Sequence, residues 1–445
     1  MVEQTVRTGM RTTDIIVTGA FSPAAIAAIG LADLYARLPL RIGLGLGGGA
    51  IALSSQDTGS GATANRDEAV TQAVILGVLS GIPFAVFGVL FGEAAIGILG
   101  APPNVARMGG LYLGIVFATA PARHVALIGA RSLQGTGDTR TPMYINIVAN
   151  GLNIVGSVVL GLGLFGAPRL EIVGVGAATG VANVFTALAL GTVMWRGWSS
   201  ATFVRPRNRV IARQLVRVSV PRVSEGLAAT IAEFPFNSIL LGFGTPVNAA
   251  FQVGRRMYQQ VTGPLSRGYN VAASVMVGQS LGEGDPDGAR YDGWAVGLLG
   301  VLTVGVIGLV LAVFAPTFVG VFTRDPETVP FAINFARAYG VTGVFLVLFS
   351  VLSGSLQGAS ETRVPFVARV SGVFGFQLGL TYLFGVVLGY GALGAYIGIG
   401  AAYIWMCTVV ASGFHWGDWA GRAADMMAER GSQTTGEESL EVEDS

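Results

Sequence analysis

The first apolar stretch of the chain contains an aspartate, a residue type that is costly to bury at membrane depth. Arg7, Arg11 and Asp14 are spaced by four and then three residues, so a helix would place all three on one face. A carboxylate in a low-dielectric setting responds strongly to protons and to neighbouring charges. Two interpretations are open: Asp14 takes up a proton or Na⁺ once per functional cycle, or it forms an ion pair with Arg11 or Arg7.

A stripe of polar residues lies in a later apolar stretch. Asn146, Asn150, Asn153 and Ser157 follow at intervals of four, three and four residues, which puts them on one face of a helix. Their amide and hydroxyl groups offer oxygens to a cation and hydrogen bonds to a substrate. The alternative is hydrogen bonding between neighbouring helices, worth about 1 kcal/mol or less in a membrane. We predict that the stripe lines a cavity and that Asn150, Asn153 and Ser157 shape the hydration of Asp14.

Other polar residues inside apolar stretches are candidates for the wall of a wet, partly cationic cavity. Asp33, Arg37 and Arg41 follow one another at spacings of four, so the acid can pair with Arg37. A single arginine of this kind more often extends its charge to the membrane interface, whereas several together indicate a polar pathway. The substrate-binding candidates are Arg37, Arg41, Asn146, Glu225, Glu233, Asn237, Arg255, Tyr258 and Gln259.

Motifs for catalysis and for cofactors are missing from the sequence. It has no HExxH or GxSxG motif, and the glycine-rich run 43–49 lacks the Gly-Lys-Ser/Thr of a phosphate-binding loop, which leaves close helix packing as its purpose. His124 and His415 lack metal-ligand spacing and receive no role. Cys407 is the single cysteine, which excludes an internal disulfide. We therefore expect no enzyme activity, no cofactor, no metal centre and no nucleic-acid partner.

Long apolar stretches must position all of these residues. Of 445 residues, 52% are hydrophobic and 12% are charged, against roughly 25% charged residues in soluble domains. Each stretch is close to the ~20 residues with which a helix crosses a bilayer. The sequence predicts an all-α polytopic membrane protein with about twelve transmembrane helices, near residues 1–21, 24–53, 67–99, 104–131, 141–165, 172–196, 214–243, 247–279, 290–322, 328–356, 364–388 and 391–415.

The two halves of the chain repeat one another. Ser-Leu-Gln-Gly at residues 132–135 recurs 223 residues later at 355–358. An even number of helices in each half makes the repeats parallel, with a pseudo-two-fold axis along the membrane normal. Met1 aligns with Ser224, inside the seventh helix, so helix 1 is short at its start: either the true start lies upstream, which we expect, or the first half-helix is absent. The same shift pairs Gln56 with Gln279, Gly59 with Gly282, Pro23 with Pro246 and Pro142 with Pro365.

An arginine-rich segment separates the halves. It should be cytoplasmic, because cytoplasmic loops are enriched in basic residues; all of the basic residues here are arginines. The predicted organisation is an N-terminal lobe at 1–196, a linker at 197–213, a C-terminal lobe at 214–416 and an acidic cytoplasmic tail at 417–445. We expect the acidic end of this tail to be disordered. Both termini then face the cytoplasm, and the multi-pass chain is expected in the cell membrane.

One segment carries a specific resemblance to a known family. The sequence LQGTGDTRTP at 133–142, followed by ANGLNI at 149–154, closely resembles the junction of helices 4 and 5 in multidrug and toxic-compound extrusion (MATE) transporters. Supporting matches are SPAAIAAIG at 22–30, ALSSQ at 52–56 and GQSLG at 278–282. The resemblance covers essentially the whole chain.

The resemblance implies two six-helix lobes around a central cavity, rocking between outward-open and inward-open states, with export coupled to H⁺ or Na⁺ entry. In prokaryotic members similar to this chain, the cation site uses an aspartate on helix 1 and, on helix 5, an asparagine followed four residues later by an aspartate. Asp14 and Asn153 match this pattern and would hold Na⁺ or a proton, whereas Ser157 replaces the second aspartate. The helix 7 glutamate of another branch falls near Ala229, so Glu225 and Glu233 are candidates only.

The class of substrate stays open at this point. Carboxylates in a cavity favour cationic amphiphilic compounds, which is our leading expectation for a cation antiporter. The arginines would equally suit anionic metabolites or the lipid-linked substrate of a flippase-like relative in the same superfamily. A membrane enzyme or a scaffold that transports nothing is the rival from a different class. The expected partners are a small organic substrate, H⁺ or Na⁺ and the lipid bilayer, and the pathway within one chain permits a monomer.

Overall fold

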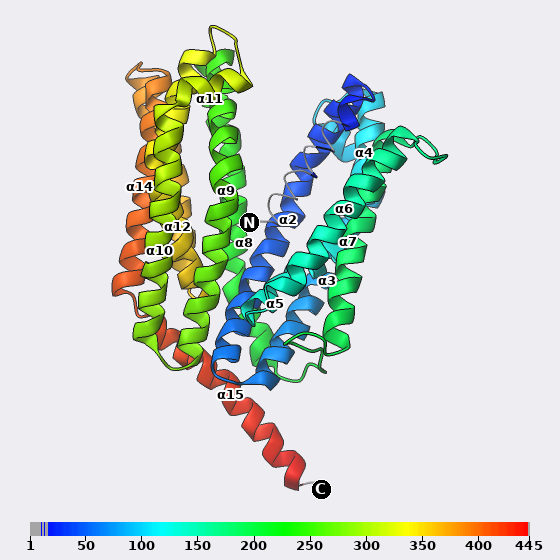
Figure 1. Cartoon of the computed structure of the whole chain (residues 1–445), viewed down its shortest axis with the longest axis vertical. Helices are drawn as coiled ribbons and strands as arrows, with labels where there is room; N and C mark the ends of the chain where they lie inside the picture. The colour runs from blue at the N-terminus through cyan, green and yellow to red at the C-terminus, as the bar shows by residue number, and fades with distance from the viewer. Residues whose placement is uncertain (1–9, 11–12, 14–16, 444–445) are drawn as a thin grey trace. The chain divides into compact units, whose positions relative to one another are not determined.

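A computed structural model of the chain describes residues 10, 13 and 17–443, with the backbone alone for 433–443. All regular elements of this part are helical (Figure 1). They are α2 (Pro23–Gly59), α3 (Thr63–Ile98), α4 (Pro103–Ala118), α5 (Ala120–Gly135), α6 (Arg140–Leu162), α7 (Glu171–Trp195), α8 (Arg209–Gly242), α9 (Thr245–Gly282), α10 (Pro286–Val313), α11 (Ala315–Phe322), α12 (Val329–Gly358), α13 (Arg363–Val370), the π-helical η1 (Ser371–Leu378) and η2 (Thr381–Val387), α14 (Ala392–Trp416) and α15 (Trp419–Glu443).

The helices account for the predicted spans. Within the described part, eight are long and apolar enough to cross a membrane, and α4 with α5 adds a ninth if the pair, bent by 47°, is one span. α8 and α9 are also long enough, but each carries several charged residues. The first predicted span lies mostly outside the described residues. The all-α prediction is confirmed.

Three predicted spans are irregular. The spans predicted at 104–131 and 290–322 each consist of two helices, because a proline in the first turn of α5 and of α11 has no N–H to continue the preceding helix. The span predicted at 364–388 turns from α-helix to π-helix after Val370, with wider turns through η1 and η2. The apolar stretches of the sequence placed these spans correctly, but they did not predict the breaks within them.

The boundaries of the helices repeat along the chain. α2 ends at Gly59 and α9 at Gly282, and α5 ends at Gly135 and α12 at Gly358. α6 begins at Arg140 and α13 at Arg363. Each pair is separated by the same 223 residues as the repeated sequence motif. The sequence repeat is thus also a repeat of secondary structure.

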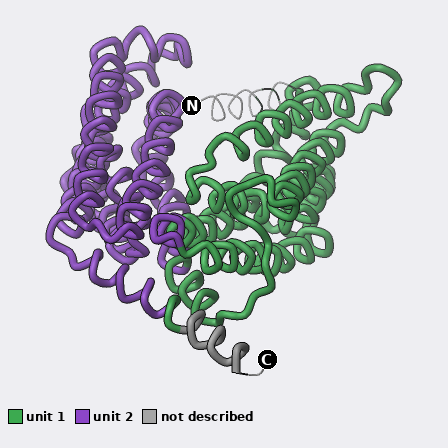
Figure 2. The backbone as a smooth tube through the Cα atoms, turned by 60° about the horizontal axis from the view of Figure 1, so that its bottom comes forward, with its two compact units in different colours: residues 1–54, 62–219, 430–445 green, residues 55–61, 220–429 purple. Residues whose placement is uncertain are grey.

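The chain divides into two compact units, coloured separately in Figure 2. The first unit contains residues 1–54, 62–219 and 430–445, and the second contains 55–61 and 220–429. The last turns of α2 therefore group with the second unit. There the side chain of Gln56 donates from Nε2 to Gly358 O at 2.7 Å and to Ser360 Oγ at 3.0 Å.

Glycines allow the helices of the first unit to approach closely. A Cβ on Gly43 would lie 2.9 Å from atoms of His124 and Leu127 on α5, and one on Gly47 would lie 3.0 Å from Arg131. Small residues at helix interfaces let backbones approach in membrane proteins. The close packing predicted for the glycine run 43–49 is confirmed.

The C-terminal segment forms a helix where disorder was expected. The ring of Trp419 is buried and stacks on Phe414, with centroids 4.9 Å apart, and its Nε1 donates to Phe414 O at 2.7 Å. Further along α15, Arg430 is fully buried and donates from Nη1 to Gln214 Oε1 at 2.7 Å. The backbone is helical through Glu443, so the prediction of disorder is wrong for this stretch. Trp419 and Arg430 anchor the helix by their buried side chains. The expectation of disorder rested on the acidic residues that follow them in sequence.

Candidate cation and substrate sites

Two polar residues on α6 form the centre of a small cluster in the first unit. Asn153 and Ser157 lie one helical turn apart, and both are buried. Asn153 donates from Nδ2 to Thr179 Oγ1 on α7 at 3.1 Å, and Ser157 Oγ donates to Asn153 Oδ1 at 3.5 Å. Thr179 Oγ1 in turn donates to Val175 O at 3.1 Å. The cluster places three neutral oxygens in an otherwise apolar interface between α6 and α7.

A second polar contact lies nearby on the same face of α7. Asn183, one turn after Thr179, donates from Nδ2 to Thr119 Oγ1 at 3.4 Å. Thr119 is the residue at which α4 ends and α5 begins. Thr119, Thr179 and Asn183 were not among the site residues predicted from the sequence. The signal was present, because Thr179 and Asn183 have the same four-residue spacing that identified the stripe on α6.

The predicted stripe is only partly buried. Asn153 and Ser157 are buried, whereas Asn146 and Asn150 are half-buried. Neutral amide and hydroxyl oxygens are suitable ligands for a hard cation when a carboxylate completes the set. Asp14, the carboxylate predicted for this role, lies outside the described residues. Within the described part, no group of three or more His, Cys, Asp or Glu side chains is placed to hold a metal ion.

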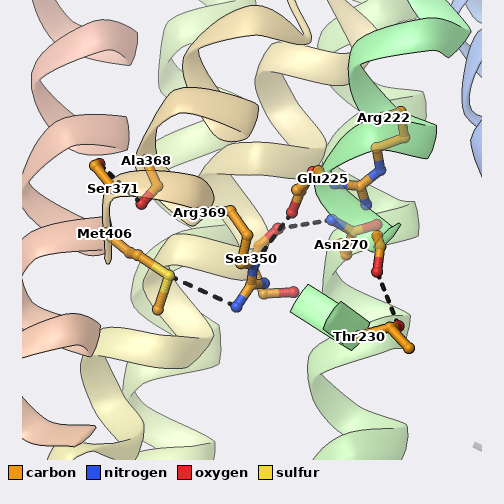
Figure 3. A network of polar contacts seen from close by, with 10 residues as sticks. Arg222, Glu225, Thr230, Asn270, Ser350, Ala368, Arg369, Ser371 and Met406 are labelled. Atoms are coloured by element: carbon orange, nitrogen blue, oxygen red, sulfur yellow. Dashed lines mark hydrogen bonds and ion pairs between the residues drawn. The ribbon is translucent and has the colours of Figure 1, made fainter. Parts of the chain in front are cut away.

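Glu225 in the second unit is held between two arginines (Figure 3). Its Oε2 accepts from Arg222 Nη1 at 2.6 Å, and its Oε1 accepts from Arg369 Nε at 3.4 Å. Glu225 itself is buried. The Arg369 guanidinium also lies 4.4 Å from the centroid of Phe349 and donates from Nη1 to Met406 Sδ at 3.6 Å. Two cations thus compensate one buried acid, and α8 is joined to α13 and α14.

Glu233, two turns further along α8, pairs with α9. Its Oε1 accepts from Arg255 Nη2 at 2.6 Å, and both side chains are about one quarter exposed (27% and 23%). Arg255 lies 5.8 Å from the ring centroid of Phe251. One turn beyond Glu233, Asn237 Oδ1 accepts from Asn248 Nδ2 at 3.1 Å and from Gln252 Nε2 at 2.9 Å. These candidates therefore belong to one polar interface between α8 and α9.

Tyr258 and Gln259 are neighbours in sequence but point in different directions. Tyr258 is buried, donates to Gly343 O at 3.2 Å and stacks on Tyr339 at 5.8 Å between centroids. Gln259 is exposed. On α2 in the first unit, Arg37 is exposed and Arg41 is half-buried. Within the second unit, Glu233, Asn237 and Arg255 share the interface of α8 and α9, whereas Tyr258 contacts α12.

Comparison with known proteins identifies the family of this chain. Residues 1–159 and 223–383 match the model of the MatE family. The chain belongs to the MatE family. This MATE transporter is 27% identical to the multidrug resistance protein NorM of Burkholderia vietnamiensis, across 93% of the chain and 91% of that protein. It is a multi-pass membrane transporter, as its motifs indicated.

Solved structures share the fold of this MATE transporter. The crystal structure of a MATE mutant matches with a TM-score of 0.86 and 21% identity, covering 96% of this chain and 94% of that one. A MOP superfamily transporter from Pyrococcus furiosus matches with a TM-score of 0.82 and 21% identity over the same shares. For that protein, a reversed polarity of the binding pocket suggests a different function. The predicted layout of about twelve helices in two six-helix lobes is confirmed.

Proposed function

We propose that this MATE transporter exports small organic compounds by antiport against H⁺ or Na⁺. The observation that carries the proposal is the buried cluster of Asn153, Ser157 and Thr179, whose neutral oxygens lie at membrane depth in an apolar interface. Polar groups in such a place cost free energy unless they are used or satisfied. Their oxygens take part in hydrogen bonds between and along α6 and α7, and they are also the kind of neutral ligand that would complete a cation site around the Asp14 carboxylate.

The proposed roles follow from the chemistry of each residue. Asp14 takes up the cation and supplies the negative charge. Asn153 and Ser157 provide oxygens that replace water around the ion, and Asn150, which is half-buried, keeps the approach hydrated. Binding of the cation stabilises the conformation in which these groups converge, and its release stabilises the other, so that access to the substrate site alternates.

Efflux of a fluorescent organic cation from proteoliposomes tests this proposal under separately imposed pH and Na⁺ gradients. The variant is Asp14→Asn, and the matched control is Asp425→Asn, which changes an exposed acid on α15. We expect flux to follow one gradient in the wild type and the control and to be lost in Asp14→Asn. Flux that follows neither gradient, or an Asp14→Asn variant that remains coupled, contradicts the proposal.

An anionic substrate is the second candidate, because three arginines pair with two acids in the described ion pairs of Glu225 and Glu233. Arg222, Arg255 and Arg369 are the cations that compensate Glu225 and Glu233, leaving a surplus positive charge. The fold is shared with the Pyrococcus furiosus transporter, for which reversed pocket polarity suggests a different function. Proteoliposomes that take up a fluorescent carboxylate or flip an anionic lipid, but not an organic cation, would support this alternative.

The surroundings of the transporter complete the proposal. We place it in the cell membrane as a monomer with both termini in the cytoplasm, supported by the arginine-rich segment around Arg205 and Arg209. Cys407 is the single cysteine, so Cys407→Ser gives a cysteine-free background. Cysteines added at either end should then react with an impermeant maleimide only after cells are opened. Labelling of intact cells would contradict the topology.

A further inference from the structure

A histidine that the proposed transport cycle does not use lies fully buried in the first unit. His124 on α5 contacts two neighbouring helices through both ring nitrogens. Its Nε2 is 2.8 Å from Pro39 O on α2, and its Nδ1 is 3.2 Å from Gly77 O on α3. The same Nδ1 is 2.9 Å from Ser80 Oγ. The contacts surround the ring with oxygens.

The protons at this site can be arranged in two complete ways. In the neutral ring, Nε2–H donates to Pro39 O while the Ser80 hydroxyl donates to the lone pair on Nδ1. In the imidazolium, Nδ1–H donates to Ser80 Oγ or Gly77 O, and the Ser80 hydroxyl turns to donate to Gly77 O at 2.9 Å. Rotation of one hydroxyl therefore satisfies both protonation states.

The charges on the surrounding helices set the balance between the two states. On α5 itself, Arg123 precedes the histidine and Arg131 lies two turns on; on α2, Arg37 and Arg41 flank Pro39, and Asp33 is the nearest acid in sequence. On α3, no charged residue occurs between Glu68 and Glu93. Burial of the ring opposes the charged form most strongly, and the arginines oppose a further positive charge, while the carbonyl dipoles of Pro39 and Gly77 favour it.

This balance depends on the position of α2. Pro39 lies inside α2 and has no N–H, so the carbonyl one turn before it loses its helical partner and the helix can bend there. A bend that moves Pro39 O away from Nε2 removes one of the two carbonyls that support the imidazolium. The proton then binds one arrangement of α2 more tightly than another, which is the requirement for a ligand to shift a conformational equilibrium.

We propose that His124 is a proton-binding site that senses the bend of α2, and that H⁺ is therefore a coupling ion of this transporter. The coupling part rests on the proposed antiport function. The proton site itself stands on the oxygens of Pro39, Gly77 and Ser80 alone.

Nitrogen NMR of the ¹⁵N-histidine-labelled protein in lipid nanodiscs tests the site directly, because the chain has 2 histidines. His415→Gln leaves His124 as the only signal, and His124→Gln assigns the other. We expect the His124 nitrogens to change from one protonated to both protonated between about pH 8 and 5. A ring that stays neutral down to about pH 5 overturns the proposal.

The variant Ser80→Ala provides a second test, because it should shift the pH midpoint at which His124 is protonated. Without the hydroxyl, the neutral ring turns the lone pair of Nδ1 toward Gly77 O, so the neutral state is disfavoured. The midpoint should move to higher pH by roughly one unit, the size expected for one hydrogen bond. The control Thr408→Ala removes an exposed hydroxyl that bonds a carbonyl of its own helix and should leave the midpoint unchanged. An unchanged midpoint in Ser80→Ala overturns the hydroxyl mechanism.

Efflux from proteoliposomes separates this inference from the proposed function. His124→Gln keeps an amide donor for Pro39 O but cannot be protonated, and we expect flux driven by the pH gradient to fall at least tenfold. Full pH-driven flux in this variant overturns the coupling role while antiport stands. If the wild type moves no substrate under any gradient and His124 still titrates, the proposed function fails and the proton site stands.

Discussion

Ser55 and Gly278 occupy equivalent positions in the two sequence repeats and lie in direct contact, with Ser55 Oγ at the place where a Cβ of Gly278 would be. The neighbouring pairs are exchanged: Gly59 lies against Gln279, and Gly282 lies against Gln56. All of these residues belong to the second unit. Such reciprocal contacts are the mark of a two-fold relationship, here within a single chain.

Gly282→Ala should destabilise the transporter, because the added methyl group overlaps the backbone of Gln56 and Gly59. We expect a loss of about 1–3 kcal/mol, seen as a lower midpoint of thermal unfolding in detergent. Gly268→Ala on the same helix is the matched control, since its Cβ would meet nothing within 4 Å. The control should be neutral or slightly more stable. Equal midpoints for the two variants would refute this packing argument.

Glu225→Gln should also destabilise the fold, for an electrostatic reason. Removing the carboxylate leaves Arg222 and Arg369 without the charge that compensates them. Breaking a buried ion pair on one side costs about 3–5 kcal/mol, and partial exposure of the arginines reduces the expected loss to about 2 kcal/mol. Glu283→Gln, an exposed acid at the end of α9, is the control and should change the unfolding midpoint little.

The pair of Glu233 and Arg255 should contribute less. Both side chains are about one quarter exposed (27% and 23%), so solvent screens their attraction. In a double-mutant cycle with Glu233→Gln and Arg255→Gln, we expect a coupling energy of about 0.5–1 kcal/mol. Unfolding midpoints of the two single variants and the double variant give this value. If the free-energy changes of the two single variants add up to that of the double variant, Glu233 and Arg255 lie in contact without energetic coupling.

Ser157→Asp should strengthen cation binding in the first unit. It adds the carboxylate that the resemblance implies four residues after the asparagine, next to the Oδ1 and Nδ2 groups of Asn153. We expect Na⁺ or proton affinity to rise about tenfold, or ~1.4 kcal/mol, measured by isothermal titration in detergent. Ser200→Asp, at an exposed serine in the segment before α8, is the control. Unchanged affinity in Ser157→Asp would argue against a cation site at Asn153.

The sequence predicted the architecture well because its signals are local and repeated. Hydropathy located the spans, and the shared offset matched helix ends such as Gly59 with Gly282. The breaks were missed because long apolar stretches dominate the pattern, although Pro121 after Thr119 marks one of them. The C-terminal helix was missed because composition cannot show that Trp419 and Arg430 are buried.

The sequence predicted individual residues of the candidate sites, but it did not predict which residues contact one another across helices. Glu225 was selected as a charge in an apolar helix, but its partner Arg369 is 144 positions away, and no spacing rule links them. Asn153 and Ser157 were found by periodicity, while Thr179 on the next helix completes their cluster. His124 received no role from the sequence, because its significance comes from carbonyls on two other helices.

The hydrogen bond between Gln56 and Gly358 can form only late in synthesis of the chain. Its partners are 302 residues apart, so Gln56 leaves the ribosome long before Gly358 exists. At about 5–20 residues per second, synthesis of that interval takes roughly 15–60 s. During this period the end of α2 lacks the residues that cover it in the finished protein, so this part of the helix is completed only when the second half of the chain has been made.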